Sequence, residues 1–283
     1  MELFLFFIII LFTVTQSSMT KLYTKNSNDV IGFNVVKATS SFLFFVFLAF
    51  FGFSLHIPTL IMGVFCGILW AISMFSSYNA LKDGPMALTS ILVSFSILIP
   101  ILYGFVVLKE PITLFKIVGF CLLFFAILLI NAKKKQANEK ANIRWAFYVL
   151  LTIISSGIAS LLQKSHQTLY PQLYRKEFMF AGMLICSLIF FCISLIKSKP
   201  EKEKKTKLQT SYAIIAGVTS ALINFFTIVL SGFQDASALF PSISAGTAAL
   251  TLLCGIVVFK EKFTTAQIIG LLLGIGSIVC LNL

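Results

Sequence analysis

Long apolar runs separated by short charged or Gly/Pro-containing breaks dominate this sequence. Because a helix needs about 20 apolar residues to cross the hydrocarbon core of a bilayer, most of these runs are close to spanning length. We therefore predict an all-α integral membrane protein with ten transmembrane helices. The predicted helices cover residues 3–20, 31–52, 58–80, 86–108, 112–131, 145–163, 177–196, 210–231, 236–259 and 264–281.

The breaks between the runs contain recognisable turn chemistry. Lys82-Asp83-Gly84-Pro85 is a turn signal, and Lys109-Glu110-Pro111 places a proline where we expect the first turn of the next helix. The longer polar segments 133–144 and 197–207 are too short for domains and are predicted to be linkers. The first run has neither a basic leader nor a small-x-small cleavage site, so we expect a retained helix and not a signal peptide.

Composition agrees with a lipid-facing surface. The chain is 58% hydrophobic and only 11% charged, whereas a soluble domain has roughly a quarter of its residues charged. The net charge of +12 resides in runs between apolar segments, which favours a membrane surface over nucleic acid. No metal-ligand cluster, Cys-x-x-Cys pair or nucleotide-binding loop is present, so no cofactor is expected. We expect the plasma membrane, and transport driven by an ion gradient, by exchange or downhill.

An internal repeat divides the sequence into two halves. GFVVLKEPITLFKIVGF and GIVVFKEKFTTAQIIGL share Gly, Val-Val, Lys-Glu and Gly in the same order and at the same spacing. The predicted organisation is a five-helix repeat over 1–132, a basic linker over 133–144 and a second repeat over 145–283. Since five crossings reverse the direction of entry, the two repeats are expected to be inverted, with the site near the midplane at their interface.

On these features the chain resembles the drug/metabolite transporter superfamily, in particular its EamA-like branch. The residues that carry the resemblance are Glu110 with Gly119 and Glu261 with Gly270, together with the five-plus-five arrangement. The resemblance implies a basket of helices around a central cavity and transport of small metabolites or drugs by alternating access. A Trp-Gly pair common near the first span of this family is absent here, so no first-helix contacts are carried over.

Polar side chains at helical spacing mark seven of the predicted helices, whereas the fifth and tenth are nearly free of them. We interpret the striped faces as lining a cavity and expect the fifth and tenth helices at the periphery. For any single Ser or Thr the alternative is a hydrogen bond to its own preceding turn or to a neighbouring helix. The predicted substrate-binding residues are Gln16, Asn34, Lys37, Trp70, Ser73, Tyr78, Ser94, Asn224, Ser244 and Thr247.

Lys37 is the charged residue placed deepest in a predicted helix. A cation there costs a few kcal/mol unless it is paired or hydrated, so we expect it to bind an anionic substrate group, with Asn34 on the same face. The alternative is that its long stem carries the ammonium to the interface. All ten acidic residues lie in connectors or at helix ends, which disfavours a buried carboxylate for cationic drugs. Trp70 and Tyr78 are the residues that could form an aromatic cage for a cation.

Two further features concern packing and protons. Gly270-x-x-x-Gly274 permits close helix approach, either in a dimer or, as we favour, within the subunit. His56 and His166 are expected in connectors as interfacial residues, with a proton relay as the alternative.

Most of the 22 Lys and Arg residues fall on one side of the predicted topology, so the positive-inside rule places both termini outside. Members of the EamA-like branch usually have both termini inside. The other side carries only Lys109, Lys116, Lys164, Arg175 and Lys176.

The leading functional hypothesis is a secondary transporter of a small, possibly amino-acid-like or otherwise anionic metabolite. Alternatives are a flippase for lipid-linked substrates, an exporter of drugs or cationic metabolites and, least favoured, a polytopic membrane enzyme. Expected partners are a small molecule and the lipid bilayer, with no nucleic acid, and the protein is expected to be a monomer or a homodimer.

Overall fold

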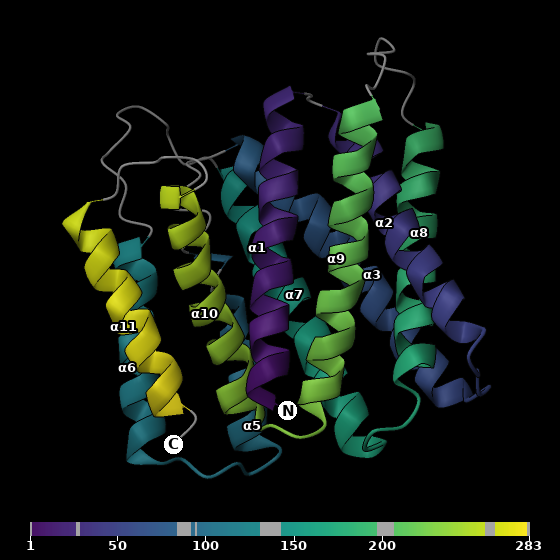
Figure 1. Cartoon of the computed structure of the whole chain (residues 1–283). Helices are drawn as coiled ribbons and strands as arrows, with labels where there is room; N and C mark the ends of the chain where they lie inside the picture. Colours follow the sequence, from purple (N-terminus) through teal and green to yellow (C-terminus); the bar gives the residue numbers. More distant parts are fainter. Residues whose placement is uncertain are drawn as a thin grey trace. The chain divides into compact units, whose positions relative to one another are not determined.

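The computed structural model describes residues 2–26, 29–83, 92–93, 95–130, 143–196, 207–257 and 264–281, and within these ranges all regular structure is helical (Figure 1). The elements are α1 (Glu2–Asn26), α2 (Val30–Ala49), α3 (Ile57–Asp83), the 3₁₀ turn η1 (Phe95–Ile97), α5 (Leu98–Val106), α6 (Leu114–Ile130), α7 (Ile143–Leu169), α8 (Arg175–Ile196), α9 (Lys207–Ser231), α10 (Ala236–Val257) and α11 (Thr265–Leu281).

Each of the ten predicted ranges contains a helix in its described residues, which confirms the all-α membrane class. Five helices are long and apolar enough to cross a bilayer by length and composition, namely α2, α3, α7, α8 and α9. Shorter apolar helices occur in α1, α5, α6 and α11. The count of ten crossings and the inversion of the repeats stay predictions.

Several predicted boundaries were wrong. Pro111 precedes α6 and does not lie in its first turn, because Thr113 caps this helix: its hydroxyl accepts from the backbone N–H of Lys116 at 3.2 Å. Arg144, assigned to the linker, lies in the first turn of α7. His166, expected in a connector, lies in the last turn of α7 and is fully buried. Apolar periodicity stops before these residues, although the hydrogen-bonded helix continues through polar ones.

Two compact units make up the structure. Unit 1 contains Met1–Ala71 and Ser165–Gly232, and unit 2 contains Ile72–Lys164 and Phe233–Leu283. The division falls inside α3, inside α7 and between α9 and α10. Each unit therefore combines segments from both halves of the sequence. The predicted repeats 1–132 and 145–283 describe sequence kinship and stay a prediction.

Unit 1 packs helices backbone to backbone. In this unit α1 lies against α9, and α2 lies against both α8 and α9 (Figure 1). A Cβ added at Gly63 of α3 would lie 2.5 Å from the carbonyl oxygen of Phe178, and one added at Gly67 would overlap the Gly182 carbonyl of α8. A Cβ at Gly217 of α9 would lie 2.5 Å from the Lys37 carbonyl oxygen. These glycines let two pairs of helices, α3 with α8 and α2 with α9, approach more closely than side chains allow.

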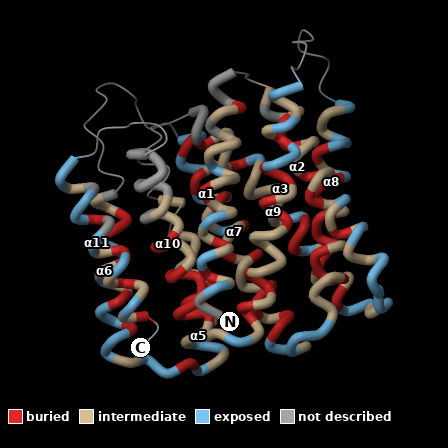
Figure 2. Tube along the Cα trace, in the orientation of Figure 1, coloured by how far each residue is buried: buried red, intermediate tan, exposed pale blue. Residues whose placement is uncertain are grey.

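Unit 2 is built around the pair α6 and α11, with α10 packed on both and on α5. The Ser277 hydroxyl of α11 donates to the Gly119 carbonyl of α6 at 2.9 Å. Gly270 and Gly274 are both buried inside this unit, in agreement with packing within the subunit. Outward positions of α6 and α11 are large and apolar (Figure 2), as expected of helices that face lipid.

Candidate functional site

The start of α2 determines how deep Lys37 lies in the helix. Asp29 precedes the helix, and its carboxylate accepts from the backbone N–H of Gly32 at 2.9 Å, which fixes where α2 begins. Lys37 follows two turns later at a half-buried position. At 1.5 Å of rise per residue it lies about 10 Å into the helix. This depth separates Lys37 from the bases at helix ends.

The surroundings of Lys37 are provided by α8 and α9. The Lys37 side chain lies near Cys186, at the middle of α8. Its backbone carbonyl lies against Gly217 and accepts from the Ser41 hydroxyl, which also donates to the Gly217 carbonyl at 2.7 Å. Within the described residues the ammonium makes no hydrogen bond or ion pair. This position near the centre of α8 disfavours the alternative in which the long stem of Lys37 carries the ammonium to the interface.

Asn34 lies one turn before Lys37 on the same face of α2. It is only 9% exposed, and its side-chain amide forms no hydrogen bond with the described part of the chain. An amide offers two donors and an acceptor, so its directional hydrogen-bonding capacity is unused. Lys37 and Asn34 together therefore present an unpaired ammonium and an unpaired amide from adjacent turns.

The other predicted residues divide between the units. In unit 1 the Asn224 amide donates to the Ser220 carbonyl at 2.8 Å, the Trp70 ring lies against Gly182, and Gln16 is half-buried. In unit 2 Ser73 and Ser244 are half-buried, and the Thr247 hydroxyl is buried without a hydrogen-bond partner among the described residues. The side chain of Tyr78, and Ser94 as a whole, lie outside the described residues.

Many hydroxyls in the predicted stripes bond to their own helix. Thr13, Thr20, Ser156 and Ser160 all donate to the carbonyl four residues earlier. This is the alternative that the sequence left open for single Ser and Thr residues. The Gln163 side-chain oxygen in unit 2 is buried without a hydrogen-bond partner among the described residues. It is therefore a better indicator of a polar ligand than these satisfied hydroxyls.

Unit 2 contains a charged cluster at the start of α10 that sequence reasoning missed. The Glu110 carboxylate accepts from the backbone N–H groups of Ala236 and Ser237 at 2.7 and 2.9 Å. It thus satisfies free donors at the positive end of the helix. Gly104 is required beside it, because a Cβ there would lie 2.6 Å from a Glu110 oxygen. No local signal links residues so far apart in sequence, although the repeat had already drawn attention to Glu110.

Two lysines complete this cluster. Lys116 forms an ion pair with Asp235 at 2.9 Å, and Lys164 donates to the Gln234 carbonyl. Lys116, 6% exposed, and Lys164, 8% exposed, are both largely buried. Their charges are therefore compensated by the protein itself. This cluster holds α6, α7 and α10 together within unit 2.

In unit 1 a cluster of polar residues joins the start of α3, the end of α7 and the start of α8. The Thr59 hydroxyl lies 2.9 Å from His56 Nδ1 and 3.1 Å from His166 Nε2. Two residues at the start of α8 hold the connector before α3: Lys176 donates to the Gly52 carbonyl at 2.7 Å, and Glu177 accepts from the Ser54 N–H at 2.8 Å. His56 lies in the connector, as predicted.

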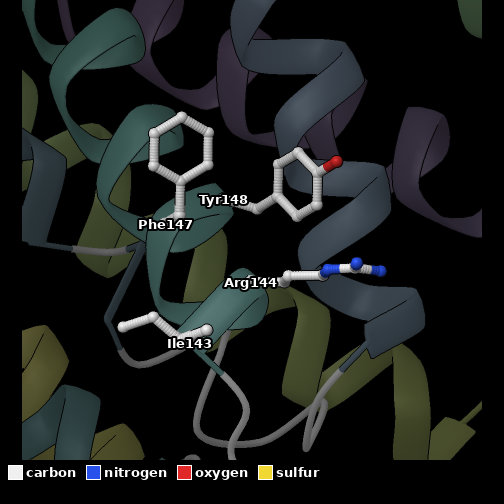
Figure 3. A pocket seen from close by; sticks show the side chains of 4 residues that line it. All are labelled: Ile143, Arg144, Phe147 and Tyr148. Atoms are coloured by element: carbon white, nitrogen blue, oxygen red, sulfur yellow. The ribbon is translucent and has the colours of Figure 1, made fainter.

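A hollow of about 440 Å³ lies at the beginning of α7 in unit 2. It is lined by Ile143, Arg144, Phe147 and Tyr148. Figure 3 shows the Arg144 and Tyr148 side chains extending to the same side of the helix. A base among aromatic and aliphatic residues is typical of a membrane interface. The predicted substrate residues are not among those that line it.

Comparisons with known proteins give a shared fold and a matching family. A solved crystal structure superposes with a TM-score of 0.80 over 99% of this chain and 95% of its own, at 13% identity, which shows a shared fold. An uncharacterized protein of Haemophilus influenzae is 23% identical over 193 residues, 66% of this chain and 62% of the relative. The chain thus matches less than two thirds of this relative's length.

The second half of the chain, residues 143–283, matches the EamA-like transporter family. This match agrees with the resemblance carried by Glu110, Gly119, Glu261 and Gly270, of which Glu261 lies outside the described residues. Members of the family are membrane transporters and not enzymes. The protein is a member of the EamA-like transporter family, within the drug/metabolite transporter superfamily.

Proposed function

We propose that this protein is a secondary transporter of the plasma membrane that moves a small anionic organic metabolite by alternating access. Lys37 is the residue that binds the anionic group of the substrate. The observation that carries this proposal is the ammonium of Lys37, which lies two turns inside α2, beside the middle of α8, with no ion-pair partner among the described residues.

The energetic argument rests on what such a charge costs. A lysine at the centre of a membrane helix costs about 2.5–3.5 kcal/mol on insertion scales. Asp235 offsets a comparable cost for Lys116, but no described residue does so for Lys37. A substrate carboxylate or phosphate would supply the missing counter-charge, and the Asn34 amide would add directional hydrogen bonds.

The described carboxylates argue against a cationic substrate. Glu110 accepts two backbone N–H groups, Glu177 accepts one, and Asp235 is paired with Lys116. Each lies at a helix end and is occupied by a donor of the protein itself. A cation would therefore find no unoccupied carboxylate among these three. For this reason we favour an anionic or amino-acid-like substrate over a cationic drug.

The remaining predicted residues are proposed to line the path of the substrate. They supply hydrogen bonds and aromatic surface, and they come from α1, α3, α9 and α10 and from residue 94. These residues are Gln16, Trp70, Ser73, Tyr78, Ser94, Asn224, Ser244 and Thr247. Thr247 is favoured among them because its buried hydroxyl has no partner in the described residues.

Uptake by the purified full chain in liposomes tests the proposal. A panel of radiolabelled amino acids, carboxylic acids and sugar phosphates is offered to wild type, Lys37→Met, Lys37→Arg and Lys207→Met. Lys207 is an exposed base at the start of α9 and serves as the matched control. We expect uptake of an anionic compound, a loss of at least about tenfold in Lys37→Met, corresponding to about 1.4 kcal/mol of binding, and partial uptake in Lys37→Arg.

Full uptake by Lys37→Met would contradict the role of Lys37. Uptake restricted to organic cations would favour an exporter of drugs or cationic metabolites. If no panel compound moves, translocation of a fluorescent phospholipid, assayed by chemical quenching of the outer leaflet, distinguishes a flippase from a transporter of soluble metabolites.

A further inference from the structure

The polar group around His166 in unit 1 forms one continuous hydrogen-bonded chain. Arg175 Nε lies 2.9 Å from the Gln167 side-chain oxygen, and Gln167 Nε2 lies 3.1 Å from His166 Nδ1. Beyond His166 the chain continues through Thr59 to His56, with the distances given above. His166 and Thr59 are fully buried, and Gln167 is 2% exposed. The chain therefore runs from the start of α8 through the end of α7 to the start of α3.

Gln167 fixes the direction of these hydrogen bonds. Its oxygen accepts from Arg175 Nε and also from the backbone N–H of Gln172 at 3.2 Å, while its nitrogen donates to the Leu173 carbonyl at 3.3 Å. Reversing the amide would set donors against donors at both N–H groups. The Gln167 nitrogen is therefore the donor to His166, and His166 Nδ1 must be an unprotonated acceptor.

The tautomers of both histidines follow from this direction. With Nδ1 accepting, neutral His166 carries its proton on Nε2 and donates to the Thr59 oxygen. The Thr59 hydroxyl then donates its own proton to His56 Nδ1. A proton on His166 Nδ1 would face the Gln167 NH₂ group. With a proton on His56 Nδ1, the Thr59 oxygen can accept from both rings through its two lone pairs, and its hydroxyl hydrogen must then turn away from His56.

We propose that His56 is the proton-binding residue of the transport cycle, so that the proton is the coupling ion. Thr59 and His166 respond to its protonation, because the Thr59 hydroxyl is hydrogen-bonded to both histidines. This proposal rests on the proposed function as a secondary transporter.

Two aromatic rings surround the His56 imidazole. The imidazole stacks on the Tyr174 ring at 4.3 Å between centroids with an interplanar angle of 3°, and the Tyr170 ring meets it edge-on at 4.8 Å. An aromatic face attracts a cation. The charged groups of the packed elements are Arg175, Lys176 and Glu177 at the start of α8. Arg175 donates to Gln167, Lys176 donates to the Gly52 carbonyl and Glu177 accepts from the Ser54 N–H.

The hydrogen-bonded residues lie where α3 begins and where α7 ends. α3 and α7 are the helices inside which the division between the two units falls, and His166 is the second residue of unit 1 after that division in α7. Thr59 links their ends, so turning its hydroxyl changes the contact between α3 and α7 within unit 1.

Histidine NMR tests the proton site without any substrate. The chain has only two histidines, so ¹⁵N-histidine labelling of the full chain in detergent or nanodiscs gives two spin systems, assigned with His56→Gln. At pH 8 we expect both rings neutral with the proton on Nε2. On acidification to pH 5, His56 gains a proton and His166 stays neutral. Protonation of His166 Nδ1 before that of His56, or a His166 proton on Nδ1 at pH 8, would overturn the proposal.

Gradient-driven uptake tests the coupling. The anionic panel compound with the highest wild-type uptake serves as probe, with and without an inward gradient of two pH units, which supports at most about hundredfold accumulation for one proton. We expect stimulation of about tenfold or more in wild type and in Thr59→Ser, which keeps the hydroxyl, and less than about twofold in Thr59→Val. The control Thr15→Val, whose hydroxyl bonds only its own helix, should respond as wild type does.

Wild-type uptake without gradient stimulation would refute proton coupling, and full stimulation in Thr59→Val would refute the role of the Thr59 hydroxyl. If no panel compound is taken up at all, the proposed function fails, and the NMR titration still decides whether His56 is the proton-binding residue.

Discussion

The charged cluster at the start of α10 in unit 2 differs from Lys37 in unit 1 in how its charges are compensated. In unit 2 the described charges near the start of α10 are compensated by the fold: Glu110 binds two backbone N–H groups, and Lys116 pairs with Asp235. In unit 1 Lys37 lies far from the ends of its helix and has no ion pair among the described residues. A charge that the fold satisfies stabilises the fold, whereas a charge left unsatisfied at a cost of kcal/mol points to a ligand.

Helix geometry explains why the difference arises. The N-terminus of a helix has unpaired backbone N–H groups that stabilise a negative charge, so Glu110 can be buried at the start of α10. The middle of a helix offers none, because its N–H and C=O groups are already paired. Lys37 therefore needs a partner that α2, α8 and α9 do not provide. The following variants test this contrast.

The largest effect is expected for Glu110→Ala. This change leaves the N–H groups of Ala236 and Ser237 without acceptors in a buried setting. Hydrogen bonds to a charged group contribute about 1.5–3 kcal/mol each, so the free energy of unfolding should fall by about 3–5 kcal/mol. Chemical or thermal unfolding in detergent measures it. Glu110→Gln keeps one acceptor oxygen and should lose about half as much; equal losses in both variants would mean that the carboxylate does not cap α10.

Backbone packing in unit 1 gives the next effect. Gly67→Ala would place a methyl group 2.9 Å from Gly182 Cα and closer still to its carbonyl oxygen, and overpacking of this kind costs about 3 kcal/mol. The matched change in unit 2 is Gly274→Ala, where the nearest atoms lie at 3.8 and 3.9 Å. Alanine there should be neutral or stabilising by up to about 1 kcal/mol. A loss of stability in Gly274→Ala comparable to that in Gly67→Ala would remove the distinction between the units.

Lysine variants separate stability from function. Lys37→Met removes an uncompensated charge, so the free energy of unfolding should rise by about 1–3 kcal/mol even though uptake is lost. Lys116→Met breaks the pair with half-exposed Asp235, so unfolding should become easier by about 1 kcal/mol. Both are measured in one unfolding assay. Destabilisation by Lys37→Met would show that the fold itself satisfies this ammonium.

Much of the fold followed from the sequence, because hydrophobic periodicity and length dominate the placement of helices in lipid. The predicted range 31–52 and the observed α2 (Val30–Ala49) differ only at their ends. Where the boundaries failed, a polar residue stayed helical for a tertiary reason. His166 lies in α7 because Thr59 and Gln167 satisfy its ring nitrogens, and no local pattern encodes those partners.

The candidate site was predictable only in part. Depth within an apolar run singled out Lys37, because a charge there is costly whatever surrounds it. Glu110 was noticed through the repeat, but its partners on α10 come from a distant part of the chain. Gly63-x-x-x-Gly67 has the same spacing as Gly270-x-x-x-Gly274, yet it was overlooked, although it makes the closer contact of the two. Spacing alone does not tell which neighbour a glycine faces.

The smallest effect is expected for Ser277→Ala in unit 2. Its hydroxyl joins α11 to the Gly119 carbonyl of α6 at 2.9 Å, fully buried. Hydrogen bonds between membrane helices contribute about 0.6 kcal/mol on average and about 1.7 at most. The loss should lie in this range, because the Gly119 carbonyl keeps its place in the helix. Ser211→Ala, which removes an exposed hydroxyl bonded to its own helix, should change the unfolding free energy by less than about 0.3 kcal/mol. A loss in Ser277→Ala well above about 1.7 kcal/mol, the most measured for such a bond, and as large as that in Glu110→Ala would mean that a neutral contact between helices stabilises unit 2 as much as the capping of α10 by Glu110.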